Sequence, residues 1–321
     1  MRVRHPIRTL LRVVLRRAPL EAQLIVTRRC NLSCGYCTEY DKVSSIIPLE
    51  VLQQRIDALH RLRVVNIALL GGEPLLHTEL PEVVAFGGRR AQVSVTTNGF
   101  LLTEKLIGRL NAAGLANMEV SIDAVTPDQT GYIQKSLKTL RPKLRLLRRF
   151  ATFDVLVNMV LCDETRGQFE DAIGELGDLG IPVTIDLLHD ARGRIAISGD
   201  EYAALWRRFY VDRTPQALLD QVYGARLLAG ERPSWHCRAG ARFLYVDEFG
   251  NVQFCSAQRG RLNKPLLEYT QQDIREQARA SKGCEEGCSL LCAYRASAFD
   301  NQPLKVLGAA LRLARRAVRR R

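Results

Sequence analysis

The sequence predicts an α/β fold with parallel strands, followed by a small cysteine-rich region. Three observations support this prediction. Apolar, β-branched segments alternate with amphipathic stretches between residues 22 and 188, and this alternation stops after residue 189. The nine cysteines fall near residue 30 and after residue 236, with Cys162 alone between the two groups. Such alternation is typical of a β/α barrel or an open parallel sheet.

Short apolar segments and longer amphipathic stretches define the expected elements. The expected strands are Ala22–Thr27, Val65–Leu70, Gln92–Thr97, Met118–Ile122, Val155–Leu161 and Val183–Leu188. The expected crossover helices are Leu49–Leu62, Glu104–Ala113, Leu137–Phe150 and Gln168–Leu179. A helical region is expected over Asp200–Leu228. Phe243–Asp247 and Val252–Phe254 should form a hairpin around Gly250.

The net charge of +13 comes from the two tails of the chain. Residues 1–17 contain six arginines and residues 304–321 contain seven lysines or arginines, without an acid in either range. Residues 18–303 are therefore neutral overall. No uncharged apolar run is long enough to span a bilayer and the N-terminus lacks a signal-peptide core, so we expect a cytoplasmic protein.

Both tails have the pattern of cationic amphipathic helices. Apolar residues recur at helical spacing among arginines in the first tail (Ile7, Leu10, Leu11, Val14, Leu15) and in the second (Leu304, Leu307, Leu311, Ala314). Such helices can lie on the inner membrane surface, or dock on the protein body with their arginines in water. Both interpretations stay open. Neither tail interleaves aromatic residues, so a nucleic-acid partner is not expected.

Cys30, Cys34 and Cys37 follow the first expected strand in the spacing Cys-x3-Cys-x2-Cys. Three thiolates in so short a loop can reach one four-iron cluster and leave its fourth iron open to a small chelating cofactor. A zinc knuckle or a disulfide framework is the alternative. Zinc sites normally need a second cysteine pair or histidines, and neither follows Cys37 nearby.

This motif resembles that of the radical S-adenosylmethionine (SAM) enzymes, and the resemblance covers about residues 20 to 190. It implies a partial (β/α)6 TIM-like barrel, a [4Fe–4S] cluster on Cys30, Cys34 and Cys37, and SAM on the open iron. In that family, reductive cleavage of SAM releases a 5′-deoxyadenosyl radical that abstracts hydrogen from the substrate. The resemblance also implies an external one-electron reductant such as flavodoxin or ferredoxin.

The resemblance assigns further residues to SAM. The segment Gly71-Gly72-Glu73-Pro74 resembles the family's GGEP motif, in which glycines allow close backbone approach and the Glu73 carboxylate suits the methionyl ammonium. The matching positions for the methionyl carboxylate, the ribose and the adenine are Thr97, Asn98, Ser121, Asp123, Asn158 and Tyr36. The alternatives are an ordinary turn, strand-end capping and aromatic packing.

The second group of cysteines is Cys237, Cys255, Cys284, Cys288 and Cys292. The spacing Cys237-x12-Gly250-x4-Cys255 resembles the opening of SPASM and twitch domains, which carry auxiliary iron–sulfur clusters. Only Cys288-x3-Cys292 matches the later SPASM pattern well. The resemblance therefore implies one auxiliary [4Fe–4S] cluster, with Cys237, Cys255 and Cys292 as the strongest ligands and Cys284 or Cys288 as the fourth. A zinc site is the alternative.

Together these features predict five segments: a basic helix (1–19), a radical SAM partial barrel (20–198), a helical linker (199–235), a SPASM/twitch-like domain (236–300) and a basic tail (301–321). Asp186 and His189 end the sixth strand and face either substrate or packed neighbours. We expect an oxidoreductase that functionalises a C–H bond of a lipid-linked or carbohydrate-like substrate. A radical SAM maturase of ribosomal peptides is one alternative. A non-catalytic iron–sulfur sensor or electron carrier is the other.

Overall fold

The fold is known from a computed structural model that describes residues 18–209, 215–306 and 308. Of the two predicted basic tails, only residues 18–19 of the first and residues 301–306 and 308 of the second are therefore described. In the described part, one nine-stranded sheet has the order β6-β5-β4-β3-β2-β1-β7-β8-β9. Neighbours from β6 to β7 are parallel, and β7, β8 and β9 are antiparallel. The fold is α/β with a partial barrel, as predicted.

The six predicted strands are present within one residue of their expected ends. They are β1 (Glu21–Thr27), β2 (Asn66–Gly71), β3 (Gln92–Thr97), β4 (Asn117–Ser121), β5 (Asp154–Leu161) and β6 (Val183–Leu187). The predicted hairpin is β7 (Phe243–Val246) and β8 (Asn251–Gln253), and β9 (Lys264–Pro265) pairs with β8. Gly250 turns the hairpin at a φ of 88°, a conformation that favours glycine.

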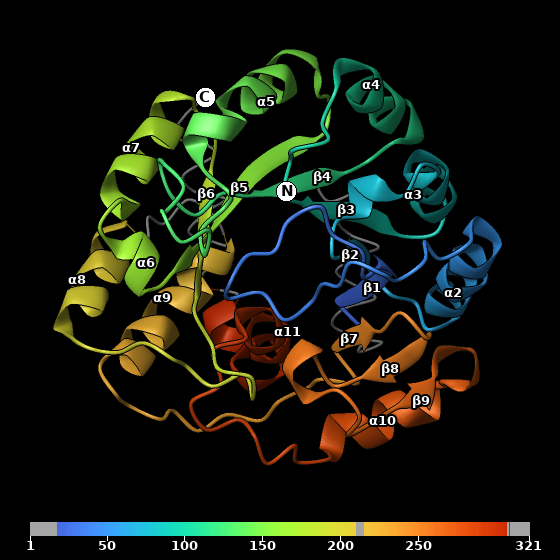
Figure 1. The fold of residues 1–321 in the computed structure, drawn as a ribbon. Coiled ribbons are helices and arrows are strands. Elements are labelled where there is room, and N and C mark those ends of the chain that lie inside the picture. The colour runs from blue at the N-terminus through green and yellow to red at the C-terminus, as the bar shows by residue number, and fades with distance from the viewer. Residues whose placement is uncertain (1–17, 210–214, 307, 309–321) are drawn as a thin grey trace.

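Helices cover one face of the curved sheet (Figure 1). Those of the barrel are α2 (Leu49–Arg61), α3 (Leu80–Gly88), α4 (Glu104–Ala113), α5 (Leu137–Phe150), α6 (Asp163–Arg166) and α7 (Phe169–Asp178). They are followed by α8 (Asp200–Phe209), α9 (Pro215–Leu228), α10 (Gln271–Arg279) and α11 (Leu291–Asn301). Short 3-10 turns are η1 (Pro74–Leu76), η2 (Ser256–Gln258) and η3 (Leu266–Glu268). No described helix is long and apolar enough to cross a membrane.

Local sequence explains the helix boundaries and the buried faces. The Thr103 side chain accepts from the Leu106 amide at the start of α4, and Gly114 ends that helix at a φ of 76°. In α5, Leu140, Leu144 and other leucines at helical spacing are buried, while its basic residues lie on the other side. The capping residues thus set the ends of α4, and the spacing of the leucines sets the buried face of α5.

Alternation along the strands gives the sheet two different faces. Alternate strand residues such as Leu24, Ile67 and Val95 pack under the helices in one apolar core. The intervening residues lie on the opposite face, which we call the inner face. Helix α11 contacts β7 and α9 (Figure 1). Because β7 pairs with β1, the cysteine-rich region continues the barrel sheet instead of forming a separate layer.

Candidate active site and cysteine clusters

The loop after β1 holds the three predicted cluster cysteines, and backbone contacts fix its course. Cys37 N donates to Cys34 O (3.1 Å), and Gly35 N donates to Tyr132 O (3.0 Å). A Cβ at Gly35 would lie 2.0 Å from the Tyr132 ring, so this position requires glycine. Leu32 N approaches the Cys30 sulfur at 3.3 Å. All three thiols are free and at least partly buried.

The two glycines of the GGEP segment lie against the backbone that leads into the cysteine loop. A Cβ on Gly71 would lie 1.9 Å from the Thr27 carbonyl oxygen, and one on Gly72 would lie 2.3 Å from that of Arg28. Gly71 has a φ of 155°. The segment therefore packs at backbone contact distance beside the cysteine loop, which is the close approach that the sequence predicts for these glycines.

Glu73 is fully buried, and its carboxylate accepts hydrogen bonds from neighbouring residues of the same chain. Its Oε1 accepts from Thr97 Oγ1 (2.6 Å) and Leu75 N (2.9 Å), and its Oε2 accepts from Asn98 N (2.7 Å). Burial raises the pKa of Glu73, and these hydrogen bonds oppose the increase. Glu73 thus joins the ends of β2 and β3, a role that the sequence did not reveal. Its predicted contact with the methionyl ammonium remains a prediction.

Asp123 is the second buried carboxylate at this edge. Its Oδ2 accepts from Tyr36 Oη (2.5 Å) and lies 3.2 Å from Lys135 Nζ, while its Oδ1 accepts from Val160 N (3.3 Å). Tyr36 therefore does more than pack, because its hydroxyl connects the cysteine loop to the end of β4. The predicted contacts of Asp123 with the ribose and of Tyr36 with the adenine remain predictions.

Lys135 places a positive charge beside the cysteine loop. Burial alone would lower the pKa of Lys135, but the Asp123 carboxylate and then the nearby Cys34 raise it. Burial raises the pKa values of Cys34 and Cys37, and Lys135 acts in the opposite sense on both. Lys135 lies in the loop between β4 and α5, and no motif in the sequence marks it.

The described residues gather no ready-made site for a single metal ion. Within the described ranges, no group of three or more His, Cys, Asp or Glu side chains is close enough to bind one metal ion. A zinc ion needs its four ligands in a tight tetrahedron, whereas the cysteines of a cubane bind different irons and stand farther apart. Cys30 also receives the Asn98 amide at 3.8 Å, a contact typical of cluster sulfurs.

The remaining predicted SAM residues lie on the inner face, Ser121 at the end of β4 and Asn158 within β5. Ser121 and Asn158 are register partners there. Asn158 Nδ2 donates to Asp186 Oδ2 (3.0 Å), so Asp186 faces the barrel interior. His189 instead turns to a backbone oxygen, that of Asp190, at 2.9 Å. Cys162 is fully buried among apolar residues, which confirms that it is a packing residue.

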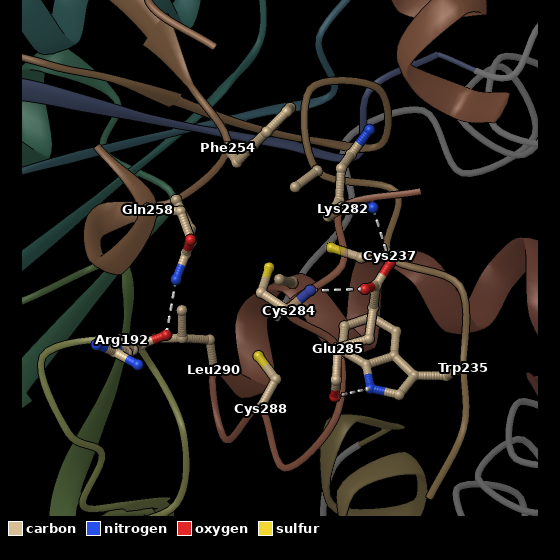
Figure 2. Close-up of a pocket in the computed structure, with 13 residues that line it drawn as sticks. Arg192, Trp235, Cys237, Phe254, Gln258, Lys282, Cys284, Glu285, Cys288 and Leu290 are labelled. Atoms are coloured by element: carbon tan, nitrogen blue, oxygen red, sulfur yellow. Dashed lines mark hydrogen bonds between the residues drawn. The ribbon is translucent and has the colours of Figure 1, made fainter. Parts of the chain in front are cut away.

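Four cysteines of the second group line one pocket (Figure 2). They are Cys237, Cys255, Cys284 and Cys288, from three segments that are distant in sequence. Figure 2 shows the sulfur atoms of Cys237, Cys284 and Cys288 turned toward the same space. Burial raises the pKa of Cys237 to about 12 and that of Cys288 to about 11. Metal binding would remove these protons, because thiolates are the ligands.

Cys292 does not line this pocket, although the sequence ranked it among the strongest ligands. It lies in the first turn of α11 and is half-buried. Burial, followed by the carboxylates of Glu21 and Asp186, raises its pKa. The Cys292 thiol therefore lies within the electrostatic influence of the Glu21 and Asp186 carboxylates. It nevertheless packs against the buried cluster that includes Cys237 and Cys255, so its place among the ligands stays a prediction.

A mouth cavity of about 390 Å³ lies between the two cysteine groups. Its walls include Thr38 and Glu39, next to Cys37, and Ser256 and Ala257, next to Cys255. Ion pairs cross it: Arg259 Nη2 lies 2.6 Å from Glu248 Oε2, and Arg28 Nε lies 3.8 Å from Glu248 Oε1. None of these charged residues belongs to a motif, so sequence reasoning missed them. His189, for which the sequence left both a substrate-facing and a packing role open, also lines this cavity.

Comparison with known proteins identifies the class. The family model described as "Radical SAM superfamily" matches residues 24–188, which hold the three loop cysteines and the GGEP segment. This chain belongs to the radical SAM superfamily. The members of this superfamily are enzymes that use a [4Fe–4S] cluster and SAM.

Individual relatives and structures cover different shares of the chain. A "Probable GTP 3',8-cyclase" of Aeropyrum pernix is 29% identical over 259 residues, 73% of this chain and 68% of the relative. A "GTP 3',8-cyclase" of Peptoclostridium acidaminophilum is 31% identical over 180 residues, 53% of each chain. This chain thus spans about two thirds of one relative and about half of the other.

Two solved structures show the same fold. The structure described as "Native anSMEcpe with bound AdoMet and Kp18Cys peptide" has a TM-score of 0.61 at 14% identity and covers 90% of this chain and 99% of its own. SuiB of Streptococcus suis bound to precursor peptide SuiA has a TM-score of 0.62 at 14% identity, with coverages of 90% and 74%. At this identity the likeness shows the fold alone.

Proposed function

We propose that this chain abstracts hydrogen from a polar substrate held on the inner face of the barrel, and that it carries an auxiliary [4Fe–4S] cluster on Cys237, Cys255, Cys284 and Cys288. One observation carries the second part of the proposal: four thiols from three separate segments line a single pocket. The free space there is only about 10 Å³, so loading a cluster must displace lining side chains such as Phe254.

The residues present suit the group that the family binds. Cys30, Cys34 and Cys37 would hold the radical SAM cluster, and the Gly71-Gly72 backbone, Thr97, Asn98, Ser121 and Asn158 lie at the same barrel edge for SAM. When bound, the cluster supplies the electron that cleaves SAM to the adenosyl radical. Lys135 adds a cation that suits the negative charge of either the cluster or the SAM carboxylate.

The polar inner face favours a carbohydrate-like substrate among the classes that the sequence suggested. Peptide modification remains the alternative, since two structures of similar fold hold peptides. A lipid-linked substrate depends on the basic tails, most of whose residues lie outside the described part of the chain. A triphosphate would lie among the carboxylates of Glu21, Glu119 and Asp186, so we do not extend the GTP activity of the named relatives to this chain.

Anaerobic reconstitution tests the proposal. The wild-type chain should hold about eight iron and eight sulfide atoms and should form 5′-deoxyadenosine from SAM under reduction. Cys284→Ala should lose close to half of the iron, while the matched control Cys162→Ala should lose none. Formation of no 5′-deoxyadenosine by fully loaded protein would favour the sensor or electron-carrier alternative over the enzyme.

The proposed partners have tests of their own. Reduced flavodoxin or ferredoxin should replace dithionite in the SAM cleavage assay if the natural reductant is such a protein. Vesicles with anionic lipids should co-sediment with the full chain and not with residues 18–303 if the tails contact the membrane. Equal sedimentation of both forms would contradict the membrane proposal and leave the enzyme proposal intact.

A further inference from the structure

The inner face of this barrel carries a network of polar side chains. Thr96 Oγ1 donates to Glu119 Oε1 (3.4 Å), Asn158 Nδ2 donates to Asp186 Oδ2 (3.0 Å), and Thr184 Oγ1 donates to Asn158 Oδ1 (3.0 Å). Complete β/α barrels usually fill this space with bulky branched residues. All five side chains are only half-buried, so their polar atoms are not fully covered by the protein.

Negative charge exceeds positive charge on this face. Arg295 of α11 is the cation that acts on both Glu119 and Glu21. Its guanidinium is shared between two acids, with Nη2 3.6 Å from Asp186 Oδ1 and Nε 2.5 Å from Asp220 Oδ2. Burial, followed by the charge of Asp186, raises the pKa of Glu119 to about 7. Burial also raises the pKa of Glu21. A bound cation would relieve both shifts.

Unpaired acceptors lie beside these acids. Asn66 Oδ1 and Asn117 Oδ1 have no hydrogen-bond partner among the described residues, and the two residues are 7% and 8% exposed. The amide nitrogen of Asn66 donates to Ser94 Oγ (3.1 Å), which leaves its oxygen as the free end. Gln92 Nε2 is an unpaired donor in the same region. Buried polar atoms normally have partners, so two free acceptors indicate a ligand that donates hydrogen bonds.

We propose that the inner face binds the substrate through a primary ammonium group, with Glu119, Asp186 and Glu21 as its counter-charges and Asn66 as a neutral acceptor. This inference rests on the proposed function and names the chemical class of its substrate. An ammonium supplies three donors and one positive charge, which match free acceptors beside excess carboxylates. A phosphate would meet the like charge of Glu21, Glu119 and Asp186, and Arg295 is already shared between Asp186 and Asp220.

Two sources could present this group: a small amino sugar, or the side chain of a lysine-containing peptide. Each source offers a pair of probes that differ by one N-acetyl group, which removes the positive charge on nitrogen. The pairs are glucosamine with N-acetylglucosamine, and Nα-acetyl-lysine amide with its Nε-acetylated form. GTP serves as the anionic probe. Titration calorimetry of the reconstituted, SAM-loaded enzyme at about pH 7 measures all five, because amines remain charged there.

The expected result is that one amine binds about tenfold or more tightly than its acetylated partner. That preference should fall to about threefold or less in Glu119→Gln and Glu21→Gln, and should persist in the surface control Glu82→Gln. The pair that shows the preference identifies the source. Equal binding within both pairs, absence of binding by either amine, or tighter binding of GTP would overturn the inference.

Formation of 5′-deoxyadenosine, measured on the same samples, separates this inference from the proposed function. If the enzyme cleaves SAM but shows no preference for amines, the function stands and the substrate class is wrong. If it prefers amines but never cleaves SAM, the binding site stands and the proposed reaction is wrong.

Discussion

Lys135→Met, in the loop between β4 and α5, should destabilise the protein strongly. Lys135 is the cation that balances the buried carboxylate of Asp123, with 3.2 Å between Nζ and Oδ2. The Lys135 side chain is 12% exposed and that of Asp123 is fully buried. Methionine keeps the length of the side chain and removes its charge, so the substitution leaves Asp123 charged and unbalanced.

The size of the effect follows from that burial. Breaking a buried ion pair by removing one partner costs roughly 3–5 kcal/mol, because the other charge stays buried. Tyr36 Oη and Val160 N still donate to Asp123, so we expect the lower end of this range, about 3 kcal/mol. For a domain of this size the melting temperature should fall by roughly 6 °C or more.

Differential scanning calorimetry of the anaerobically reconstituted protein is the assay. Lys143→Met is the matched control, because Lys143 lies on α5 and donates to the Leu102 carbonyl instead of a carboxylate. Adding Asp123→Asn to Lys135→Met should restore most of the loss, since both charges are then gone. A melting temperature for Lys135→Met equal to that of Lys143→Met would refute the reasoning.

Two further predictions concern the GGEP segment and the inner face. Gly71→Ala should prevent assembly of the cysteine loop and lower the iron content, because its Cβ would lie 1.9 Å from the Thr27 oxygen. Gly108→Ala is the control, because the space around Gly108 is open. It should leave the iron content unchanged and stabilise α4 by up to about 1 kcal/mol. Glu119→Gln should raise stability at pH 8 by roughly 1–3 kcal/mol and leave it unchanged near pH 4. The native state holds the Glu119 proton up to a pKa of about 7, against an ordinary 4.5, so wild-type stability falls as pH rises between these values. Urea titrations at both pH values measure the difference, and a variant less stable than wild type at pH 8 would contradict the assignment.

The sequence predicted the barrel strands well because their burial is regular. β3 and α4 begin and end where the pattern places them, since period-two and helical patterns agree with the final packing. The pairing of β7 with β1 was not predictable. It joins residues about 220 positions apart, as in Glu21 with Phe243, and no local pattern encodes such a pairing.

The motif cysteines and glycines were also predictable, because their chemistry depends on close spacing. Lys135 and Arg295 were not, since no local pattern pairs either with its carboxylate: Asp123 for Lys135, and Asp186 and Asp220 for Arg295. The ranking of Cys292 among the ligands stays a prediction: it does not line the pocket of the other four cysteines, but it packs against the buried cluster that includes Cys237 and Cys255.

Iron and acid-labile sulfide analysis of three anaerobically reconstituted proteins tests the central claim most directly. We predict about eight iron atoms in the wild type, about four in the triple variant Cys30→Ala/Cys34→Ala/Cys37→Ala, and about four in Cys237→Ala/Cys255→Ala. Only the triple variant should lose 5′-deoxyadenosine formation completely. A wild-type content of about four, unchanged when Cys237 and Cys255 are removed, would contradict the account of two clusters.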